Sequence, residues 1–510
     1  MYSVDTIDRP RPVLAHGSAG QRRDLAFLIG AALLLLLFGL GGRELWLPDE
    51  PRHVAIAEEL RSFVHGWRGL VLLHLNGAVY TQKPPLFHWF AALAGAPAGR
   101  VTELAARLPS AFAALGTLVL VAQLGRHMFR PVVGWLAVAV LLTLPAFLSA
   151  GRLARPDALL TTCVTAAFLL AWRLDRGEGS ERPNRLLLHA AMGMGVLAKG
   201  PVALLLPLLG VLAYLLWERR LGQLRRFVTL PALALSLGPG LAWFAAAAAL
   251  GPGDFVANSF WDNLILRYFA GSAHDEPWWY YAKILPKAFL PWTLVWPLCA
   301  LRARAAFRGP AASEARRAFC FLIAAIGAAL VFFSVSAGKR AVYLQPIHPL
   351  AAVLCAAALA DAYGALSDPR RRERWSRAAR IALPVVVAGE IAFYGWLEPT
   401  LDSRNSLRQL AEAAAAAAGP GKPIGVFDDD SKAASIAYYA RRQVRPLAGA
   451  EDAARFVAAG GRGIVIEQDD LAKLGDLASY RVVDRIAARR REFLVLAPAL
   501  RTPVGAQPLR

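Results

Sequence analysis

Charged side chains are scarce in this sequence. Only 18% of its 510 residues are Asp, Glu, Lys or Arg, whereas 56% are hydrophobic. Soluble globular domains carry charge on about a quarter of their residues. This shortage excludes an ordinary soluble domain and is typical of an integral membrane protein.

Cysteines and several common catalytic motifs are also rare or missing. The four cysteines lie in apolar runs without a C-x-x-C pair, which predicts neither a disulfide framework nor a cysteine metal site. The sequence has no G-x-x-x-x-G-K-[ST] phosphate loop, so use of a nucleoside triphosphate is not predicted. It also has no H-E-x-x-H motif, and no internal repeat is visible.

Positive charge, by contrast, is in excess. The formal net charge is +20, and the arginines stand in short clusters between apolar runs. Cytoplasmic loops of membrane proteins collect Lys and Arg. Membrane topology explains this pattern better than nucleic-acid binding does, so no nucleic-acid partner is predicted.

Apolar runs follow one another along most of the chain. About twenty apolar residues span a bilayer as a helix. On that rule we predict spans near residues 25–42, 108–125, 131–149, 158–174, 187–200, 201–217, 227–250, 283–301, 318–335, 341–360 and 379–397. The run at residues 84–98 is short and better suited to an interfacial or re-entrant helix. The first run follows several arginines, as in a signal peptide, but no small-residue cleavage site comes after it, so we expect it to be retained.

The basic clusters predict the orientation of these spans. If all the clusters are cytoplasmic, residues 1–24 form a cytoplasmic tail and alternate loops face the other side of the membrane. The opposite-side segments are then residues 43–107, 150–157, 199–201, 251–282, 336–343 and everything after residue 397. We therefore predict a mainly α, polytopic bundle of about 11–13 spans over residues 25–397, with its polar segments gathered at the outer leaflet.

Two outer segments have patterns of their own. Apolar side chains recur at helical spacing between residues 55 and 64, which predicts an amphipathic helix along the membrane surface. Residues 398–510 alternate β-type runs with helical stretches, which predicts a small outer α/β domain. We expect strands at 423–427, 463–467, 482–486 and 493–497, and helices near 432–441, 451–459 and 469–479. The Asp428-Asp429-Asp430 run fits a solvated turn and helix cap better than a metal site.

The motif Asp49-Glu50-x-Arg52 is the first candidate for chemistry. Two carboxylates at a membrane boundary are costly unless they are paired or functional. A spacing of three residues places Arg52 on the Asp49 face if a helix begins there. The alternative is a plain helix start, with Pro48 and both acids at the positive end of the helix dipole.

Three further motifs place charge beside apolar runs. Lys83-Pro84-Pro85 sets a cation at the mouth of a short apolar segment, where a snorkelling lysine is the alternative. Arg155-Pro156-Asp157 puts a carboxylate at the outer end of a span, where a helix cap is the alternative. Lys199-Gly200-Pro201 interrupts a long apolar stretch, so Lys199 needs a carboxylate or phosphate partner inside the protein.

The remaining polar groups come from two later outer segments. Residues 251–282 supply Asn263, Arg267 and Tyr268 together with aromatic residues, about half of which fit an interfacial belt. Lys339, Arg340 and Tyr343 stand at the start of a span. Cations suit a phosphate leaving group, and a carboxylate suits deprotonation of an acceptor hydroxyl. Without a nucleotide site, the predicted phosphate donor is a membrane lipid.

Four motifs in this order resemble a known family. They are Trp46-x-Pro48-Asp49-Glu50-x-Arg52, Lys83-Pro84-Pro85-Leu86, Arg152-Leu153-Ala154-Arg155-Pro156-Asp157 and Ala198-Lys199-Gly200-Pro201. Over roughly residues 20–400 the chain is similar to the bacterial ArnT-like branch of the protein mannosyltransferase superfamily. The resemblance implies a GT-C membrane glycosyltransferase that moves a sugar from a polyprenyl-phosphate donor to an acceptor at the periplasmic face of the inner membrane.

The resemblance also implies roles for individual residues. Asp49 would activate or orient the acceptor, and Asp157 would be the second acidic residue of the site, with Glu50 a further catalytic candidate. The donor phosphate would be held by Lys83, Arg267 and Tyr343, and the polar cavity would be completed by Arg52, Tyr80 and Lys199. Lys339 and Arg340 are expected to add two cations. Relatives often carry Glu, associated with a metal, where this chain has Gln82, so neither a metal nor another cofactor is predicted.

The resemblance leaves the acceptor open. The best-known branch adds 4-amino-4-deoxy-L-arabinose to lipid A and gives polymyxin resistance; a protein or another envelope glycan is the alternative acceptor. A lipid transporter or flippase fits less well, because the charged groups gather on one face and no repeat is visible. We expect membrane lipids as further partners and a monomeric state.

Overall fold

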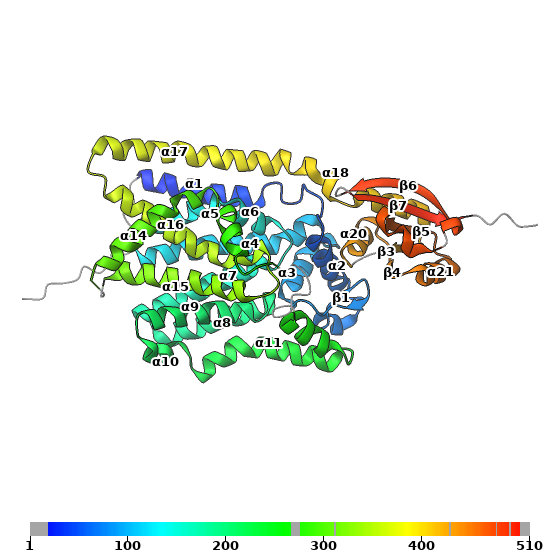
Figure 1. Ribbon diagram of the computed structural model, residues 1–510, viewed down its shortest axis with the longest axis horizontal. Helices are drawn as coiled ribbons and strands as arrows, with labels where there is room; N and C mark the ends of the chain where they lie inside the picture. The colour runs from blue at the N-terminus through cyan, green and yellow to red at the C-terminus, as the bar shows by residue number, and fades with distance from the viewer. Residues whose placement is uncertain are drawn as a thin grey trace, which may run out of the picture.

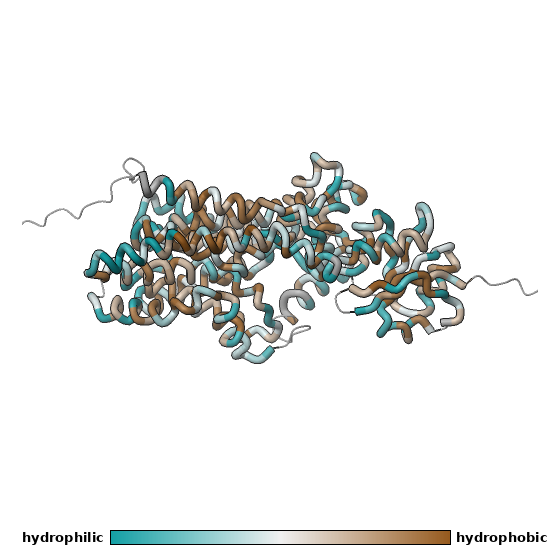
Figure 2. Tube along the Cα trace, turned by 90° about the horizontal axis from the view of Figure 1, so that it is seen from above, coloured by the Kyte–Doolittle hydropathy of each residue, from teal (hydrophilic) through white to brown (hydrophobic). Residues whose placement is uncertain are grey.

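The computed structural model describes residues 19–266, 276–310, 313–427, 430–475, 477–488 and 491–499. A helical bundle makes up most of it, and a small mixed domain lies at one end (Figure 1). The middle of the bundle is predominantly hydrophobic, and hydrophobic segments also run through the small domain (Figure 2). The predicted fold class, a mainly helical bundle with a small C-terminal mixed domain, is confirmed.

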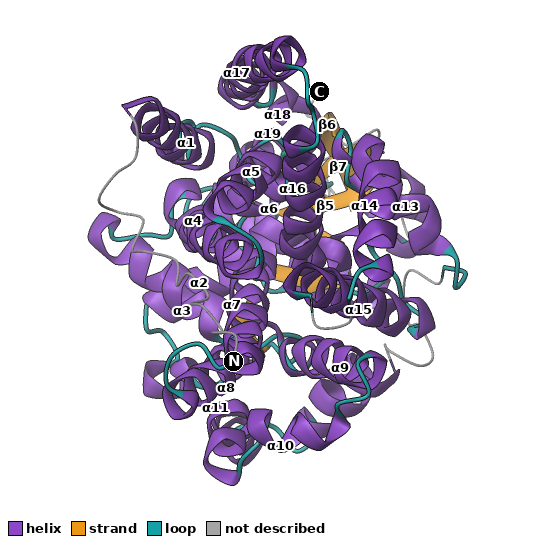
Figure 3. Cartoon of the chain, turned by 90° about the vertical axis from the view of Figure 1, so that its left-hand side faces the viewer, coloured by secondary structure: helices purple, strands orange, loops and turns teal. Residues whose placement is uncertain are grey.

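From α1 to the long α17, both included, the described residues form sixteen α-helices. They are α1 (Ala19–Leu37), α2 (Asp49–Arg61), α3 (Leu86–Gly95), α4 (Glu103–Met128), α5 (Pro131–Leu142), α6 (Pro145–Arg152), α7 (Asp157–Arg176), α8 (Glu181–Lys199), α9 (Val202–Trp217), α10 (Leu224–Phe227), α11 (Leu230–Leu250), α13 (Tyr280–Ala288), α14 (Trp296–Arg308), α15 (Glu314–Val335), α16 (His348–Gly364) and α17 (Pro369–Ala392). Seen from the end away from the small domain, α1 and α17 stand at the edge of the bundle (Figure 3).

The predicted spans can be compared with the length and composition of the helices. Among the described residues, 6 helices are long and apolar enough to cross a membrane, or up to 8 if two bent pairs each count as one span. All eleven predicted runs are largely helical, but three of them fail this test. Helices α1 and α8 carry at least three charged residues in every 18-residue stretch, and α9 has only 16 residues. The bent pairs are α5 with α6, at 72°, and α13 with the residues up to the end of α14, at 102°.

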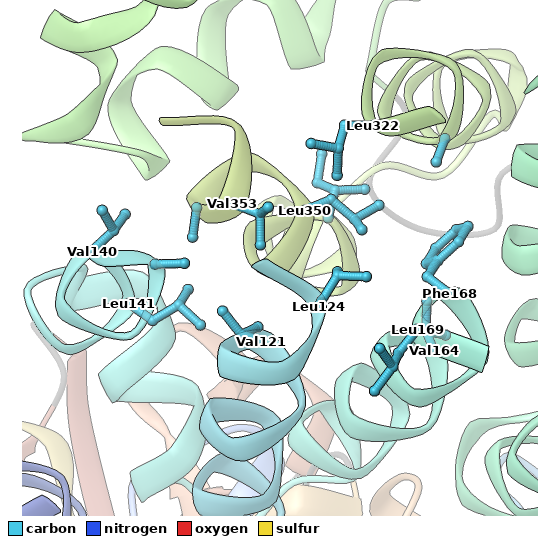
Figure 4. Packing of buried hydrophobic residues seen from close by; sticks show 14 of the residues in the cluster. Val121, Leu124, Val140, Leu141, Val164, Phe168, Leu169, Leu322, Leu350 and Val353 are labelled. Carbon is cyan, nitrogen blue, oxygen red and sulfur yellow. The ribbon is translucent and has the colours of Figure 1, made fainter. Parts of the chain in front are cut away.

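The bundle core is aliphatic and aromatic. Buried side chains from α4, α5, α7, α15 and α16 meet in it, including Val121, Leu141, Phe168, Leu322 and Leu350 (Figure 4). Small residues let other helices approach closely. A Cβ on Gly193 of α8 would lie 2.2 Å from the carbonyl oxygen of Leu235 on α11, so only glycine fits there.

The first outer segment, between α1 and α4, is folded onto protein. It contains α2, the 3₁₀ helix η1 (Gly66–Leu70), the hairpin of β1 (His74–Leu75) and β2 (Ala78–Val79), α3 and the 3₁₀ turn η2 (Ala96–Ala98). The predicted short helix near residues 84–98 is therefore present as α3 and η2. The predicted amphipathic helix is α2, but α3 and α20 of the small domain cover it, and Phe63 and Val64 lie exposed beyond its end.

The C-terminal domain is built on a five-stranded mixed sheet. Its strands are β3 (Ile424–Phe427), β4 (Val444–Leu447), β5 (Gly463–Glu467), β6 (Tyr480–Ala488) and β7 (Arg491–Pro498), in the order β4-β3-β5-β7-β6. The pairs β3–β4 and β3–β5 are parallel, and the other pairs are antiparallel. The edge strand β4 was not predicted, because Arg445 and Pro446 interrupt its apolar pattern.

Helices of this domain connect the sheet to the bundle. They are α18 (Asp402–Asn405), α19 (Arg408–Ala418), α20 (Asp430–Ala440) and α21 (Ala450–Ala458), while the predicted helix at residues 469–479 is two 3₁₀ turns. Asp428 and Asp429 lie outside the described residues. On α20, the Tyr439 hydroxyl accepts a hydrogen bond from the Leu45 backbone at 2.6 Å, and the Tyr438 hydroxyl accepts one from Arg100 at 2.9 Å. The domain thus covers the first outer segment.

Candidate active site

Asp49 begins α2 and lies between two arginines that come from distant parts of the chain. Its Oδ2 is 3.2 Å from Arg155 Nη2 and 3.1 Å from Arg340 Nη2. Arg155 precedes α7, and Arg340 precedes the 3₁₀ helix η6 (Ala341–Ile347), which packs against α7. The Asp49 side chain remains 16% exposed, so solvent reaches this carboxylate.

Asp157 is the second carboxylate of the same cluster. Its Oδ2 is 3.4 Å from Arg155 Nε, and its Oδ1 accepts a hydrogen bond from the Lys199 ammonium. Arg155 thus links the two carboxylates. Asp157 is almost completely buried, and Lys199 is the buried cation that the sequence required to have a partner.

Local backbone geometry places Lys199 at this point. Helix α8 ends at Lys199 because Gly200 adopts φ +95°, a conformation that residues with a Cβ rarely adopt. Pro201 then precedes α9. The Lys199 ammonium also lies 5.5 Å from the centre of the Tyr343 ring on η6, within the range of a cation–π interaction.

Lys83 precedes α3 and lies within electrostatic range of the same group of charges. It interacts electrostatically with Asp157 and with His53. Tyr80 is buried in the adjacent wall, where its ring meets His88 edge-on at 6.3 Å. Lys83 and Arg340 therefore join Asp49, Arg155, Asp157 and Lys199 in one polar cluster, which we call the Asp49 cluster.

Arg52 connects this region to the C-terminal domain. Its guanidinium donates hydrogen bonds to Gln82 Oε1, at 3.5 Å, and to Ser431 Oγ on α20, at 2.5 Å. Gln82 thus binds an arginine, and among the described residues no group of three His, Cys, Asp or Glu side chains is placed to hold a metal ion.

Two predicted site residues lie in positions that do not suit chemistry. The Lys339 ammonium is buried and donates hydrogen bonds to three backbone carbonyls, those of Glu276, Ser336 and Ala337. All three of its N–H groups are used, so the expected role in substrate binding does not fit. Glu50 is 1% exposed and also lies away from solvent, in a separate network.

The Glu50 network is a saturated, buried ion cluster. Glu50 accepts hydrogen bonds from Arg43 at 2.8 Å, from Arg107 at 2.9 and 3.2 Å, and from the Trp46 and Ala154 backbone N–H groups at 3.1 and 3.0 Å. Burial acts to raise the pKa of this carboxyl, but the charges of Arg107 and Arg43 outweigh it and bring the pKa to about 2. These contacts hold the segment before α2 against α4 and the start of α7. These contacts favour a structural role for Glu50 over the catalytic role predicted from the sequence.

Sequence reasoning missed three residues around the site. Arg107 was overlooked although a buried arginine in an apolar helix demands a partner, which was the available signal. His53 and His88 form a buried pair, with Nδ1 and Nε2 3.0 Å apart, beneath Lys83 and Arg155. Burial lowers the pKa of both, that of His88 to about 3, so the pair is neutral. No spacing in the sequence indicated this pair.

Some predicted residues cannot be placed. Arg267 and Tyr268 lie outside the described residues, and the side chain of Asn263 is not described. In the described part, the Asp49 cluster contains four cations and two carboxylates, a net charge of +2. Such a cluster can hold a phosphate group and still offer a carboxylate to a second reactant.

Comparison with known proteins gives consistent results. Residues 82–243 match the family described as dolichyl-phosphate-mannose-protein mannosyltransferase. The undecaprenyl phosphate-α-4-amino-4-deoxy-L-arabinose arabinosyl transferase of Serratia proteamaculans is 30% identical over 414 residues, which cover 75% of this chain and 72% of that protein. A similarly named transferase 2 of Pseudomonas fluorescens is 32% identical over 353 residues, which cover 68% of this chain and only 58% of that protein.

A solved structure shares the fold over nearly the whole chain. The crystal structure of ArnT from Cupriavidus metallidurans bound to undecaprenyl phosphate superposes with a TM-score of 0.70 at 21% identity. The match covers 94% of this chain and 98% of that one.

Proposed function

Because this chain belongs to the ArnT-like family of GT-C membrane glycosyltransferases, we propose that it transfers a sugar from a polyprenyl-phosphate donor to an acceptor hydroxyl or amine outside the cytoplasm. The observation that carries this proposal is the convergence of Asp49, Lys83, Asp157, Lys199 and Arg340, from five separate segments, on one solvent-reached cluster. A cluster with a net positive charge can stabilise the negative charge that develops on a phosphate leaving group.

The reaction is a direct displacement at the anomeric carbon. The acceptor atom forms a bond to this carbon as the bond from the carbon to the phosphate oxygen breaks. The acceptor proton passes to the Asp49 carboxylate, which the two arginines orient. The electron pair of the broken bond leaves on the polyprenyl phosphate.

The cations stabilise the leaving group more than the donor. In the donor the phosphate is a diester with one negative charge, and after transfer it is a monoester that gains a second charge. Lys83 and Arg340 therefore interact more strongly with the phosphate in the transition state than in the bound donor, which lowers the barrier. Arg340 is the more exposed of the two arginines in the cluster, at 34% against 17% for Arg155.

In this proposal, Asp157 and Lys199 hold the groups around Asp49 in position. Their ion pair fixes the end of α8 against the start of α7 and sets Lys199 over the Tyr343 ring. Arg155 connects that pair to Asp49. On this proposal, Tyr343 and Tyr80 line the donor side of the cavity.

The named relatives support a more specific version of the proposal. The Serratia and Pseudomonas proteins are named for transfer of 4-amino-4-deoxy-L-arabinose from undecaprenyl phosphate. We extend this to undecaprenyl phosphate as the carrier, 4-amino-4-deoxy-L-arabinose as the sugar and lipid A as the acceptor. The protein then works as a monomer in a bacterial inner membrane, with the Asp49 cluster and the C-terminal domain toward the periplasm, as the arginine clusters predict.

Replacement of the proposed base tests the mechanism. We expect Asp49→Asn to lower transfer from the undecaprenyl-phosphate sugar to lipid A by about 10²- to 10⁴-fold, the usual contribution of a general base. Thermal unfolding and binding of undecaprenyl phosphate should change little. The matched control is Glu59→Gln, which removes an acid of the same helix that binds His65 outside the cluster. Turnover of Asp49→Asn near that of the control would reject Asp49 as the base.

Two further measurements separate the donor from the acceptor. Lys83→Ala should weaken binding of undecaprenyl phosphate to the purified protein, and unchanged affinity would reject the phosphate-holding role of Lys83. Mass spectrometry of lipid A, envelope glycans and envelope proteins, from cells with and without the gene, identifies the acceptor. A sugar that appears only on glycan or protein would replace lipid A in this proposal and leave the transfer mechanism intact.

A further inference from the structure

A cavity of about 450 Å³ opens at the end of the bundle away from the C-terminal domain. It lies where the C-terminal ends of α14 and α16, the start of α15 and the turn between α4 and α5 come together. These elements face the viewer in Figure 3. The volume falls within the range of about 300–1,000 Å³ typical of sites for small ligands. Its lining residues are Arg130, Arg302, Ala305, Ala306, Ala315, Phe319, Asp361 and Gly364.

The charges in this cavity do not cancel. Arg130 Nη2 lies 3.4 Å from Asp361 Oδ1, so these two residues are paired. Arg302 is half-buried, and among the described residues nothing forms a hydrogen bond or ion pair with it. One unpaired guanidinium therefore faces the cavity and gives it a net positive charge. A guanidinium in such a place suits an anion, and phosphate in particular, which it binds through two parallel hydrogen bonds.

The rest of the lining is apolar. Ala305, Ala306, Ala315 and Phe319 form a wall without hydrogen-bonding side chains. Ala305 and Ala306 lie near the C-terminal end of α14, and Ala315 and Phe319 lie near the start of α15. A free inorganic ion gains nothing from an apolar wall, whereas the glycerol and upper acyl chain of a phospholipid would bury apolar surface against it.

The position of the cavity along the bundle also favours a lipid headgroup. The cavity lies among the arginine-rich loops that the sequence predicts to be cytoplasmic, where the inner leaflet presents anionic headgroups. Basic pockets between helix ends on that side of a membrane are typical binding sites for such headgroups.

We propose that this cavity binds the glycerol phosphate of an anionic phospholipid, with Arg302 on the phosphate and the α14–α15 wall against the glycerol and acyl chain. The site lies at the opposite end of the bundle from the Asp49 cluster and does not depend on the proposed transfer reaction. Asp361 limits the affinity, because it neutralises Arg130.

The test uses the full-length protein in nanodiscs of phosphatidylcholine, with or without phosphatidylglycerol. We expect phosphatidylglycerol to raise the melting temperature and to remain bound in native mass spectrometry. Arg302→Gln should weaken this binding about five-fold, which corresponds to about 1 kcal/mol for one arginine near a membrane surface. The matched control is Arg304→Gln, an exposed arginine of the same helix that does not line the cavity.

A gain of binding provides the second arm. Asp361→Asn removes the partner of Arg130 and leaves two guanidinium groups for the phosphate, so binding of phosphatidylglycerol should strengthen by a similar factor. Asp361 is 41% exposed, so the change should cost little stability. A loss of binding in Asp361→Asn, or equal losses in Arg302→Gln and Arg304→Gln, would overturn the proposal.

A third arm identifies the source of the phosphate. Glycerol 3-phosphate and inorganic phosphate are added to protein in phosphatidylcholine alone. We expect neither to reproduce the rise in melting temperature at millimolar concentration. A full rise that Arg302→Gln abolishes would keep the phosphate site but reject the lipid as its occupant.

Discussion

Asp49 and Glu50 are consecutive residues in the first turn of α2, yet their carboxylates lie in two different surroundings. Asp49 is partly open to solvent and binds two arginines, one of which is itself 34% exposed. Glu50 is closed from solvent and accepts hydrogen bonds from two arginines and two backbone N–H groups. The two networks share the segment before α7, which supplies Arg155 to Asp49 and the Ala154 N–H to Glu50. They differ in their other partners, which are Arg340 before η6 for Asp49, and the chain before α2 together with Arg107 of α4 for Glu50.

The difference separates a chemical role from a structural one. A base must exchange a proton with a substrate, which requires access and a lone pair that is not already committed. Glu50 has neither, and its low pKa reflects a carboxylate that stays charged to hold the fold. Removal of one partner from such a buried ion cluster leaves the others uncompensated.

The largest expected effect on stability comes from the buried Glu50 network. Glu50→Ala should destabilise the protein by about 3–5 kcal/mol, because Arg107 would lose its ion-pair partner in a buried position and Arg43 would keep only its pair with Glu398. Thermal unfolding in detergent measures this loss, with Asp49→Asn as the comparison variant. A Glu50 variant that keeps wild-type stability but loses transfer would restore Glu50 to the catalytic residues and remove the distinction.

Acid should destabilise the protein through the same network. The folded-state pKa of Glu50 is about 2 and the ordinary value is 4.5, so the stabilisation is fully present above pH 4.5 and is lost as the pH falls toward 2. The contribution is on the order of 3 kcal/mol. Unfolding followed between pH 6 and 3 should steepen below about 4.5 in the wild type. The same profile in a folded variant such as Glu50→Gln should lack that component, and identical profiles would assign the acid sensitivity to other groups.

Loss of the ion pair between Asp157 and Lys199, in the Asp49 cluster, should cost less stability than loss of Glu50. Lys199→Met removes the closer partner of Asp157 and leaves Arg155, so we expect about 1.5–3 kcal/mol of destabilisation and a large loss of transfer. The double variant Asp157→Asn with Lys199→Met should recover most of the stability, because both members of the pair are gone, but not the activity. Recovery of both would make the pair purely structural.

The smallest effect should come from the contact between the two domains. Ser431→Ala removes the acceptor of an Arg52 hydrogen bond, worth about 1 kcal/mol. If α20 positions Arg52 beside the cluster, the KM for the acceptor should rise about five-fold while kcat changes little. Ser435→Ala is the matched control, because its hydroxyl on the same helix is buried and has no hydrogen-bond partner among the described residues. Equal kinetics of the two variants would show that the contact between Ser431 and Arg52 does not affect the site.

Much of the architecture could be predicted from local patterns. Apolar runs located the helices of the bundle, and alternating runs located four of the five strands of the C-terminal domain. Of the eleven predicted spans, up to eight are long and apolar enough to cross a membrane, while charged residues at the ends of α1 and α8 and the shortness of α9 keep these three helices below that test. The apolar face of α2 was recognised, but α3 and α20 cover it. A periodic pattern indicates that a face is buried and does not indicate what buries it.

In the candidate site, too, some residues could be predicted from the sequence and others could not. The motifs around Asp49, Lys83, Asp157 and Lys199 could be found because charged residues beside apolar runs need a partner or a purpose. Lys339 was assigned to the site for the same reason, although backbone carbonyls turn out to satisfy it. Ser431 could not be found, because nothing in its sequence surroundings marks a serine some 380 residues away as a partner of Arg52.

The sequence by itself determined that this chain enters a membrane, which residues carry charge at its boundaries and which of those charges require partners, because hydrophobic length and the cost of burying charge are local properties. Only the tertiary structure decided which partner each charge received. Two neighbouring carboxylates of equal chemistry became a proposed base and a structural anchor because the helix start gives them different partners, and solvent reaches only one of them.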